Sequence, residues 1–279
     1  MLIASSGVTN VGRVRTNNED CFQVVEALNL FVLSDGMGGE AHGEIASALA
    51  VETVVKHCLD TESDPAMTVF GDMPAGFSEK TKRLSSAVHL ANKNIYDSAQ
   101  QHSEQHGMGA TLTAAWIDGA KLSIAHVGDS RAYLLRSGTL QQLTSDHSLV
   151  AEQVRRGILT PAEAEKSEMQ SVLLRALGAH PEIEVDAEEH TLFGRDVLLL
   201  CSDGLTRMVT EPEIAGTLQA EPDPTKAAER LVELANDQGG ADNITVVVVR
   251  TSSESKGWFS WLRRGARNRP EGNGSAGGR

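Results

Sequence analysis

Aromatic side chains, cysteine and long apolar runs are all scarce in this sequence of 279 residues. Phe, Trp and Tyr make up only 4% of the chain, so a hydrophobic core must be built mainly from Val, Leu, Ile and Ala. The longest apolar runs, such as Val197–Cys201, have the length of a strand and not of a membrane-spanning helix. With 40% hydrophobic and 23% charged residues, the composition is that of a globular protein with one large domain or two small ones.

The cysteines and the first residues bear on the cellular compartment. Cys21, Cys58 and Cys201 are odd in number and show no paired spacing, which argues against a disulfide framework and against a cysteine-based zinc site. Residues 1–8 are too short and too uncharged to form a secretory signal. We therefore expect a reducing, cytoplasmic location.

Positive charge is in deficit, with 25 Lys and Arg against 38 Asp and Glu, for a net charge of −13. This balance argues against nucleic acid as the principal partner. The charge is also uneven, because residues 254–279 carry six basic and two acidic side chains. From Ser252 the composition shifts to Ser, Gly, Arg and Asn. We expect a catalytic domain at residues 1–251 and a basic, disordered tail at 252–279.

The tail contains one segment, Trp258–Arg264, in which aromatic rings stand beside basic side chains. Such a segment suits weak docking on an anionic membrane surface or on a partner. Gly257 and Gly265 bracket it and disfavour a stable helix in water. The alternative is that its aromatic rings pack back onto the catalytic domain, or that its arginines pair with the acidic surface.

Short apolar runs bounded by Gly or Asp alternate with longer helical stretches over residues 1–251. Gly119 and Gly138 lie between such runs, as hairpin turns require. A helix is expected to begin at Thr160-Pro161, and Thr210–Glu213 has the pattern of a capping box. The pattern predicts an α+β fold of antiparallel sheets with helices packed outside them. The expected strands are 31–34, 112–116, 122–127, 132–135, 197–201 and 244–249, and the expected helices are 43–59 and 79–105.

Several of these predicted strands have an aspartate directly after or directly before them. Asp35, Asp129 and Asp203 each follow an apolar strand, and Asp242 opens one. A single aspartate of this kind more often belongs to an ordinary turn. Four aspartates at strand ends, however, can converge on one point. Converging carboxylates repel one another unless cations lie between them, and oxygen ligands without Cys or paired His suit Mg²⁺ or Mn²⁺. The sequence therefore predicts a divalent metal site.

A phosphoryl group at such a site needs a basic partner. Arg13 and Arg15 stand close in sequence to Glu19 and Asp20, and an arginine fork matches phosphate oxygens. The alternative is a surface salt bridge among these four residues.

Eight motifs, in this order along residues 5–250, resemble those of the type 2C family of metal-dependent protein phosphatases, in its compact bacterial branch. The motifs are Arg15–Asp20, Ser34–Gly39 with Gly43–Ser47, Gly107–Thr113, Val127–Tyr133, Leu143–Ser148, Leu174–Gly178, Leu200–Leu205 and Gly239–Val246.

The resemblance implies a four-layer α-β-β-α sandwich and the metal-dependent hydrolysis of phosphoserine and phosphothreonine in proteins. It implies that Asp35 bridges two metal ions, that the Gly36 carbonyl binds one of them, and that Asp203 and Asp242 complete the two sites. Asp129 with Asp203 would hold a third ion. Glu19 and Asp20 would act mainly through metal-bound water, Arg15 would bind phosphate, and residues 146–180 would form a flap beside the site. Phosphorylated serine/threonine kinases and their targets are the implied partners.

Two positions depart from the family pattern. Met37 stands where animal members place a histidine proposed as the general acid, and Glu40 stands where bacterial members often have one. The donor of the leaving-group proton is therefore unassigned, and His42 or a metal-bound water are the alternatives. Competing functions are a two-metal nuclease, which the acidic charge disfavours, and a pseudophosphatase, which would be expected to lack one of the four aspartates.

Overall fold

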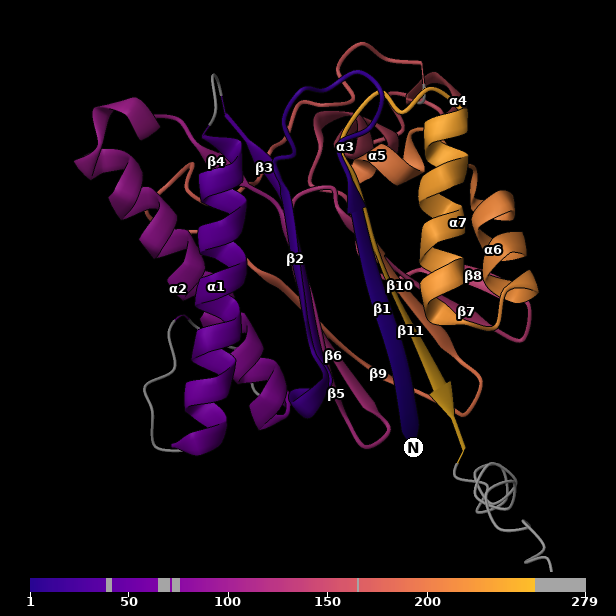
Figure 1. Ribbon diagram of the computed structural model, residues 1–279. Coiled ribbons are helices and arrows are strands. Elements are labelled where there is room, and N and C mark those ends of the chain that lie inside the picture. The colour runs from indigo at the N-terminus through magenta and orange to yellow at the C-terminus, as the bar shows by residue number, and fades with distance from the viewer. Residues whose placement is uncertain (39–41, 65–70, 72–75, 165, 254–279) are drawn as a thin grey trace, which may run out of the picture.

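The computed structural model describes residues 1–38, 42–64, 71, 76–164 and 166–253. Two antiparallel sheets lie face to face, and a helix pair covers the outer face of each (Figure 1). This arrangement confirms the predicted four-layer α-β-β-α sandwich. The tail segment Trp258–Arg264 and Glu40 lie outside the described residues. Among the helices of the described ranges, none is long and apolar enough to cross a membrane.

The first sheet has the strand order β1 (Leu2–Asn10), β11 (Ile244–Ser252), β10 (Val197–Cys201), β7 (Arg131–Arg136) and β8 (Thr139–Gln142). The second sheet has the order β2 (Asp20–Val25), β3 (Leu30–Met37), β5 (Leu112–Asp118), β6 (Lys121–Val127) and β9 (Asp186–Thr191), with β4 (Gly109–Ala110) paired to β3. Every pairing between these strands is antiparallel.

The helices divide between the two sheets. Helices α1 (Gly43–Ser63) and α2 (Glu79–Gln101) cover the second sheet, and α6 (Glu211–Ala220) and α7 (Pro224–Asp237) cover the first. The short helices α3 (Leu149–Arg155), α4 (Pro161–Ala164) and α5 (Asp203–Thr206) lie at the upper end of the sandwich in Figure 1, and two 3₁₀ turns span Glu26–Leu28 and Ser103–Gln105.

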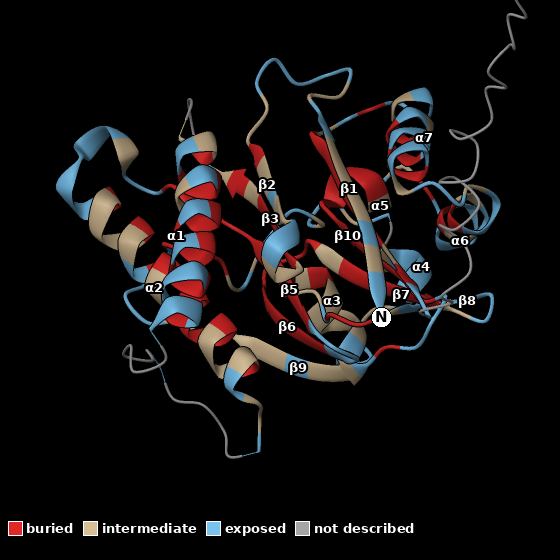
Figure 2. Cartoon of the chain, turned by 60° about the horizontal axis from the view of Figure 1, so that its bottom comes forward, coloured by how far each residue is buried: buried red, intermediate tan, exposed pale blue. Residues whose placement is uncertain are grey.

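The central strands bury both faces, which explains why they read as continuous apolar runs. In β3, Leu30 and Val32 pack against α1 and α2, while Phe31 and Leu33 pack between the sheets. In β10, Leu198 and Leu200 likewise face the opposite sheet. The buried layers are visible as red strands between helices whose outer faces are exposed (Figure 2).

All eight predicted strands and helices are present, with changes at their ends. The predicted helix 79–105 ends at Gln101, and its last residues form the 3₁₀ turn Ser103–Gln105 instead. In α1, Ile45 is 37% exposed, and small residues such as Ala46 and Ala50 fill the buried face. The hairpin turns at Gly119 and Gly138 and the capping box at Thr210 are confirmed, and both glycines have positive φ.

Candidate metal centre

Six carboxylates gather where the two sheets end on the same side of the sandwich, and we call them the carboxylate cluster. Asp20 begins β2 and lies opposite Asp35 near the end of β3, so both come from the second sheet. Asp203 follows β10 and Asp242 precedes β11, so both come from the first sheet. The cluster is therefore built across the sandwich and not within one sheet. Its members are Glu19, Asp20, Asp35, Asp129, Asp203 and Asp242.

The near-repeat Ser-Asp-Gly occurs at the equivalent end of one strand in each sheet. A Cβ atom on Gly36 would lie 2.0 Å from the Gly43 carbonyl oxygen, and one on Gly204 would lie 1.9 Å from the Asn243 carbonyl oxygen. Both glycines thus make room for a neighbouring backbone segment. The contact also brings the first turn of α1 against the strand that carries Asp35.

Burial and like charge act together on the cluster. Burial, reinforced by the charges of Asp20, Asp203, Asp129 and Asp242, raises the pKa of Asp35 well above its usual value. Burial also raises the pKa of Asp20 to about 7 and, with the charge of Asp203, that of Asp129 to about 7. Carboxyl groups in this state are electrostatically poised to take up a cation or to hold protons.

Hydrogen bonds orient the cluster from beneath. The Ser202 hydroxyl donates to Asp20 Oδ2 at 2.8 Å and accepts from the Thr245 amide at 2.9 Å. The Glu19 amide donates to Asn243 Oδ1 at 2.8 Å, and the Asn243 side-chain amide donates to the carbonyls of Val11 and Asn17. These contacts tie the loop before β2 to the start of β11, and so bring together acids that are far apart in the sequence.

Arginine supplies the positive charge among the carboxylates. Arg207 pairs with Asp203, and its guanidinium lies 3.9 Å from Asp129 Oδ2 and 3.7 Å from Asp242 Oδ2. Arg15 donates to Asp242 Oδ2 at 2.9 Å, and its side chain is 51% exposed at the rim. The sequence predicted Arg15 as the phosphate-binding residue, with a salt bridge to Glu19 or Asp20 as the alternative, and it gave no role to Arg207; the carboxylate that Arg15 contacts is Asp242. The signal for Arg207 was its position four residues after Asp203 on a helix.

The donor set of the cluster fits hard divalent cations. Asp20 Oδ1 and Asp203 Oδ1 are buried and have no hydrogen-bond partner among the described residues. A buried acceptor left unpaired is costly, and a cation satisfies it. Within the described ranges, no three His, Cys, Asp or Glu side chains already stand in a metal-holding arrangement, and the guanidinium of Arg207 lies among the acids.

The histidines stand outside the ligand set. His42 precedes α1 at the N-cap, and its carbonyl accepts from the Ala46 amide at 3.2 Å. His126 is buried and contacts Thr113 Oγ1 at 3.0 Å and the Ser145 carbonyl at 3.2 Å, so it supports the loop of Asp129 from below. Met37 ends β3.

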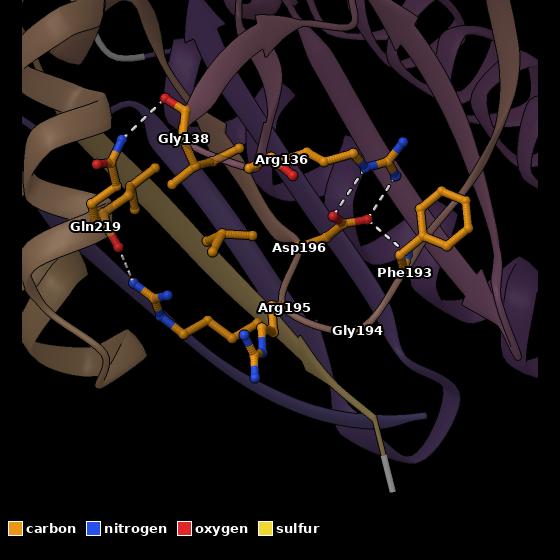
Figure 3. A pocket seen from close by; sticks show the side chains of 12 residues that line it. Arg136, Gly138, Phe193, Gly194, Arg195, Asp196 and Gln219 are labelled. Atoms are coloured by element: carbon orange, nitrogen blue, oxygen red, sulfur yellow. Dashed lines mark hydrogen bonds and ion pairs between the residues drawn. The ribbon is translucent and has the colours of Figure 1, made fainter.

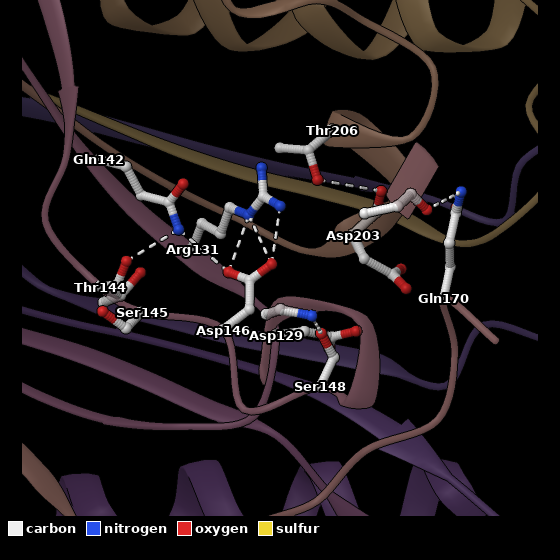
Figure 4. Close-up of polar contacts among 12 residues, drawn as sticks. Asp129, Arg131, Gln142, Thr144, Ser145, Asp146, Ser148, Gln170, Asp203 and Thr206 are labelled. Atoms are coloured by element: carbon white, nitrogen blue, oxygen red, sulfur yellow. Dashed lines mark hydrogen bonds and ion pairs between the residues drawn. The ribbon is translucent and has the colours of Figure 1, made fainter. Parts of the chain in front are cut away.

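A cavity of about 860 Å³ adjoins the cluster. Asp129, Asp203 and Arg207 line it on the side of the acids, and Val150 and Val154 of α3 line it as well. Arg131 also lines the cavity and donates to both oxygens of Asp146 (Figure 4). The cavity is thus polar beside the acids and apolar along α3, and it is large enough for a segment of peptide.

An α-β-β-α sandwich with oxygen ligands at the shared end of its sheets defines a metal-dependent phosphohydrolase. The sequence model of the family "Protein phosphatase 2C" matches residues 13–245. The chain belongs to this family, and it is a metal-dependent serine/threonine protein phosphatase.

Relatives and solved structures agree with this assignment. The serine/threonine phosphatase stp of Listeria welshimeri is 37% identical over 252 residues, which cover 89% of this chain and 96% of that protein. The serine/threonine protein phosphatase PstP of Mycobacterium tuberculosis is 40% identical over 237 residues, covering 85% of this chain and 43% of that protein. A crystal structure of PstP superposes with a TM-score of 0.80 at 38% identity, covering 91% and 100% of the two chains. Another holds the PstP catalytic domain with two manganese ions, at a TM-score of 0.77 and 37% identity, covering 90% and 99%.

Proposed function

We propose that the carboxylate cluster binds two Mn²⁺ or Mg²⁺ ions, with Asp35 shared between them. Asp203, Asp242 and the Gly36 carbonyl complete the two sites, and Asp129 with Asp203 holds a third ion. Glu19 and Asp20 contact the ions mainly through water. The observation that carries this proposal is the pair of buried, unpartnered oxygens on Asp20 and Asp203 within a group of like charges.

Bound divalent cations of this kind make hydroxide available near neutral pH and neutralise charge on a phosphoryl group. The residues of the chain supply the rest. Arg15 at the rim binds the phosphoryl oxygens of the substrate, since its guanidinium is half-exposed and only one of its donors is used by Asp242. Arg207 holds Asp203 in place. A cysteine nucleophile does not fit, because burial raises the thiol pKa of Cys21, Cys58 and Cys201, that of Cys201 to about 12.

The proposed substrates are proteins phosphorylated on serine or threonine, among them serine/threonine kinases and their targets. The cavity beside the cluster is an argument for a peptide substrate. It extends from the cluster along α3 and α6, where apolar side chains such as Val154 and Pro212 line it. We further propose that residues 1–251 form the catalytic domain and that the enzyme acts in the cytoplasm. The unpaired state of all three cysteines favours a reducing compartment.

Phosphate release from a phosphothreonine peptide tests the proposed chemistry. Turnover is expected with Mn²⁺ or Mg²⁺, and it is expected to stop with excess EDTA and to return when the metal is restored. Full turnover after exhaustive chelation would contradict the mechanism. A nuclease assay under the same metal conditions serves as the counter-test, and no cleavage is expected.

We propose that the tail segment Trp258–Arg264 docks weakly on an anionic membrane surface or on a partner. Each basic side chain near an anionic surface contributes about 1 kcal/mol. Sedimentation with anionic vesicles compares the full chain with the variant Arg263→Ser/Arg264→Ser. Binding of the full chain is expected to weaken with added salt, and binding of the variant is expected to be weaker and less sensitive to salt. Equal binding by both chains would leave the tail without this role.

A further inference from the structure

A second cavity, of about 510 Å³, lies at the far end of the strands that carry the carboxylate cluster. Strand β10 begins at this cavity with Val197 and ends at Cys201, just before Asp203. Strand β11 runs the other way, from beside Asp242 to Arg250 in the cavity wall. With a rise of roughly 3.3 Å per residue, the two sites are on the order of 20 Å apart. The cavity is therefore separate from the site already described.

Three arginines line this second cavity, and two of them have no carboxylate partner. Arg136 pairs with Asp196 and stacks on the ring of Phe193, 4.6 Å from its centroid (Figure 3). In contrast, no carboxylate of the described residues lies within 4.0 Å of Arg195 or Arg250. Three arginines against the one acid Asp196 leave the lining of this cavity positively charged, on a protein whose net charge is −13.

Arg195 reaches the cavity from a backbone conformation that an L-residue adopts only at a cost. Its φ is 82°, in the left-handed region where glycine is favoured. The turn is held on both sides, because the Arg195 amide donates to the Thr251 carbonyl at 2.9 Å and the Phe193 amide donates to Asp196 Oδ2 at 2.7 Å. Strain of this kind persists where the surroundings fix the backbone, and it often accompanies a binding function.

Arg250 is held at the cavity by helix α6. Its Nη2 donates to the carbonyls of Leu218 and Glu221, which are at the C-terminal end of that helix. Its Nε is buried and has no partner among the described residues. Glu221 and Asp223 lie near enough to favour the charged form, but burial outweighs them and lowers the pKa of Arg250. The guanidinium is thus fixed in position, incompletely bonded and short of negative charge.

We propose that this cavity, which we call the arginine cavity, is a second anion site that binds a phosphate group. Two uncompensated arginines match the charge of a phosphate dianion, and the guanidinium fork matches its oxygens. The apolar side chains of Leu135, Val197 and Leu218 line the same cavity, and its volume exceeds that of a free phosphate ion. It therefore has room for inorganic phosphate and also for the carbon atoms of a phosphorylated side chain, which are the two possible sources of the phosphate group.

Calorimetric titration of the full chain in Mg²⁺ tests the proposal with two probes. One is inorganic phosphate, and the other is a peptide with a non-hydrolysable phosphonate in place of phosphoserine. Two binding events per chain are expected for the wild type, one at the catalytic site and one at the arginine cavity. Tighter binding of the peptide at the second event would identify a phosphorylated side chain as the source, and equal binding would identify the free ion.

Three variants show which binding event occurs at which of the two sites. Arg195→Gly removes one charge and also relieves the left-handed backbone, so it is expected to weaken the second event by about tenfold or more while raising the melting temperature. Weaker binding can then not be ascribed to unfolding. Arg230→Ala removes an exposed arginine on α7 that pairs with Glu233, and is expected to change neither event. Arg15→Ala is expected to remove only the first event.

Turnover of a small aryl phosphate by Arg195→Gly is expected to equal that of the wild type. The proposal is overturned if the wild type shows a single phosphate-binding event that is lost in Arg15→Ala. It is also overturned if Arg195→Gly shows both binding events with the same affinities as the wild type. If Arg15→Ala keeps both events while Arg195→Gly loses one, the catalytic role of Arg15 fails and the arginine cavity stands. The two proposals are thus tested separately.

Discussion

Asp186 accepts a hydrogen bond from the buried ring of His147, with 3.1 Å between Asp186 Oδ2 and His147 Nε2. The other oxygen of Asp186 accepts from Arg175 Nη1 at 2.7 Å. His147 also accepts from the Gly128 amide through Nδ1 at 3.1 Å, directly before Asp129. Because His147 and Arg175 lie toward the two ends of the flap, residues 146–180, one carboxylate at the start of β9 fixes both ends and, through His147, the loop that presents Asp129.

Asp186→Asn is therefore expected to impair peptide turnover selectively. The hydrogen bond from His147, followed by the effect of Arg175, holds the pKa of Asp186 well below its usual value, so the wild-type group is ionised throughout the assay range. The amide keeps the shape but one of its ends becomes a donor. We expect kcat/KM to fall about tenfold on a phosphopeptide and less than about threefold on a small aryl phosphate.

Glu188→Gln is the matched control for Asp186→Asn, because Glu188 is on the same strand, its side chain is 48% exposed and it pairs with His190. It is expected to leave both substrates unchanged. Equal losses on both substrates by Asp186→Asn would show that the contact supports the whole site and not the flap.

Arg15→Ala is expected to weaken use of the substrate and to spare metal binding, because its proposed partner is the phosphoryl group. The wild-type guanidinium donates to Asp242 from an exposed position, so its removal leaves no buried donor unpaired. We expect KM to rise and kcat to fall as well, with a total loss in kcat/KM of about tenfold or more. Steady-state kinetics with a parallel Mn²⁺ titration measures both effects. An unchanged kcat/KM would return Arg15 to the role of a surface ion pair.

Asp35→Asn is expected to cost more activity than the same change at any other member of the carboxylate cluster. Asp35 is partly buried, lies opposite Asp20 in the sheet and is close to the charges of Asp203, Asp129 and Asp242, as a shared ligand should be. Asp129→Ala, by contrast, should leave the two central ions bound while impairing turnover on protein substrates. Calorimetry with Mn²⁺ separates the two variants. Near wild-type kcat for Asp35→Asn at saturating Mn²⁺ would refute the shared role.

The central strands and the acids that follow them could be predicted from the sequence, because local signals define them. Asp35 and Asp203 each follow an apolar run that is buried on both faces, and an aspartate next to glycine ends such a run visibly. The edge strand β9 was not predicted. Its sequence, Asp186–Thr191, is polar, and only pairing with β6 makes it a strand.

The contacts between distant segments could not be predicted in the same way. Asn243 binds the backbone of the loop at Val11 and Asn17, more than two hundred residues earlier, and no local pattern marks such a contact. Arg207 was missed for a related reason. Its i,i+4 spacing from Asp203 is an ordinary helical ion pair, and only the fold shows that Asp129 and Asp242 approach the same guanidinium.

The stability of the metal-free chain is expected to fall as pH rises, which is opposite to the usual behaviour of paired carboxylates. The ordinary pKa of an aspartate is 3.8, whereas burial raises the pKa of both Asp20 and Asp129 to about 7 in the folded chain. Between these values the folded state binds more protons than the unfolded state, so each unit of pH lowers the free energy of unfolding. The raised pKa of Asp35 and of Asp203 acts in the same direction.

His126 opposes this trend at the acidic end. Burial and His147 lower its pKa to about 4 from 6.5, so its contribution to stability is complete above the higher value and is lost as pH falls toward the lower one. Burial also lowers the pKa of His57, so two histidines oppose the four carboxyl groups, and neither changes charge above its unfolded pKa. The downward slope should therefore be clearest between about pH 6 and about pH 7, and it should flatten at higher pH.

Melting temperatures in EDTA and in Mn²⁺ between about pH 5 and about pH 8 measure this effect. The stabilisation by Mn²⁺ is expected to grow with pH, because the ion competes with protons for the same oxygens. Asp20→Asn removes one of the four groups, so its EDTA curve should fall less steeply than that of the wild type. A metal-free chain that is most stable near pH 8, or a Mn²⁺ effect that does not depend on pH, would show that these carboxyl groups are not held as the structure places them.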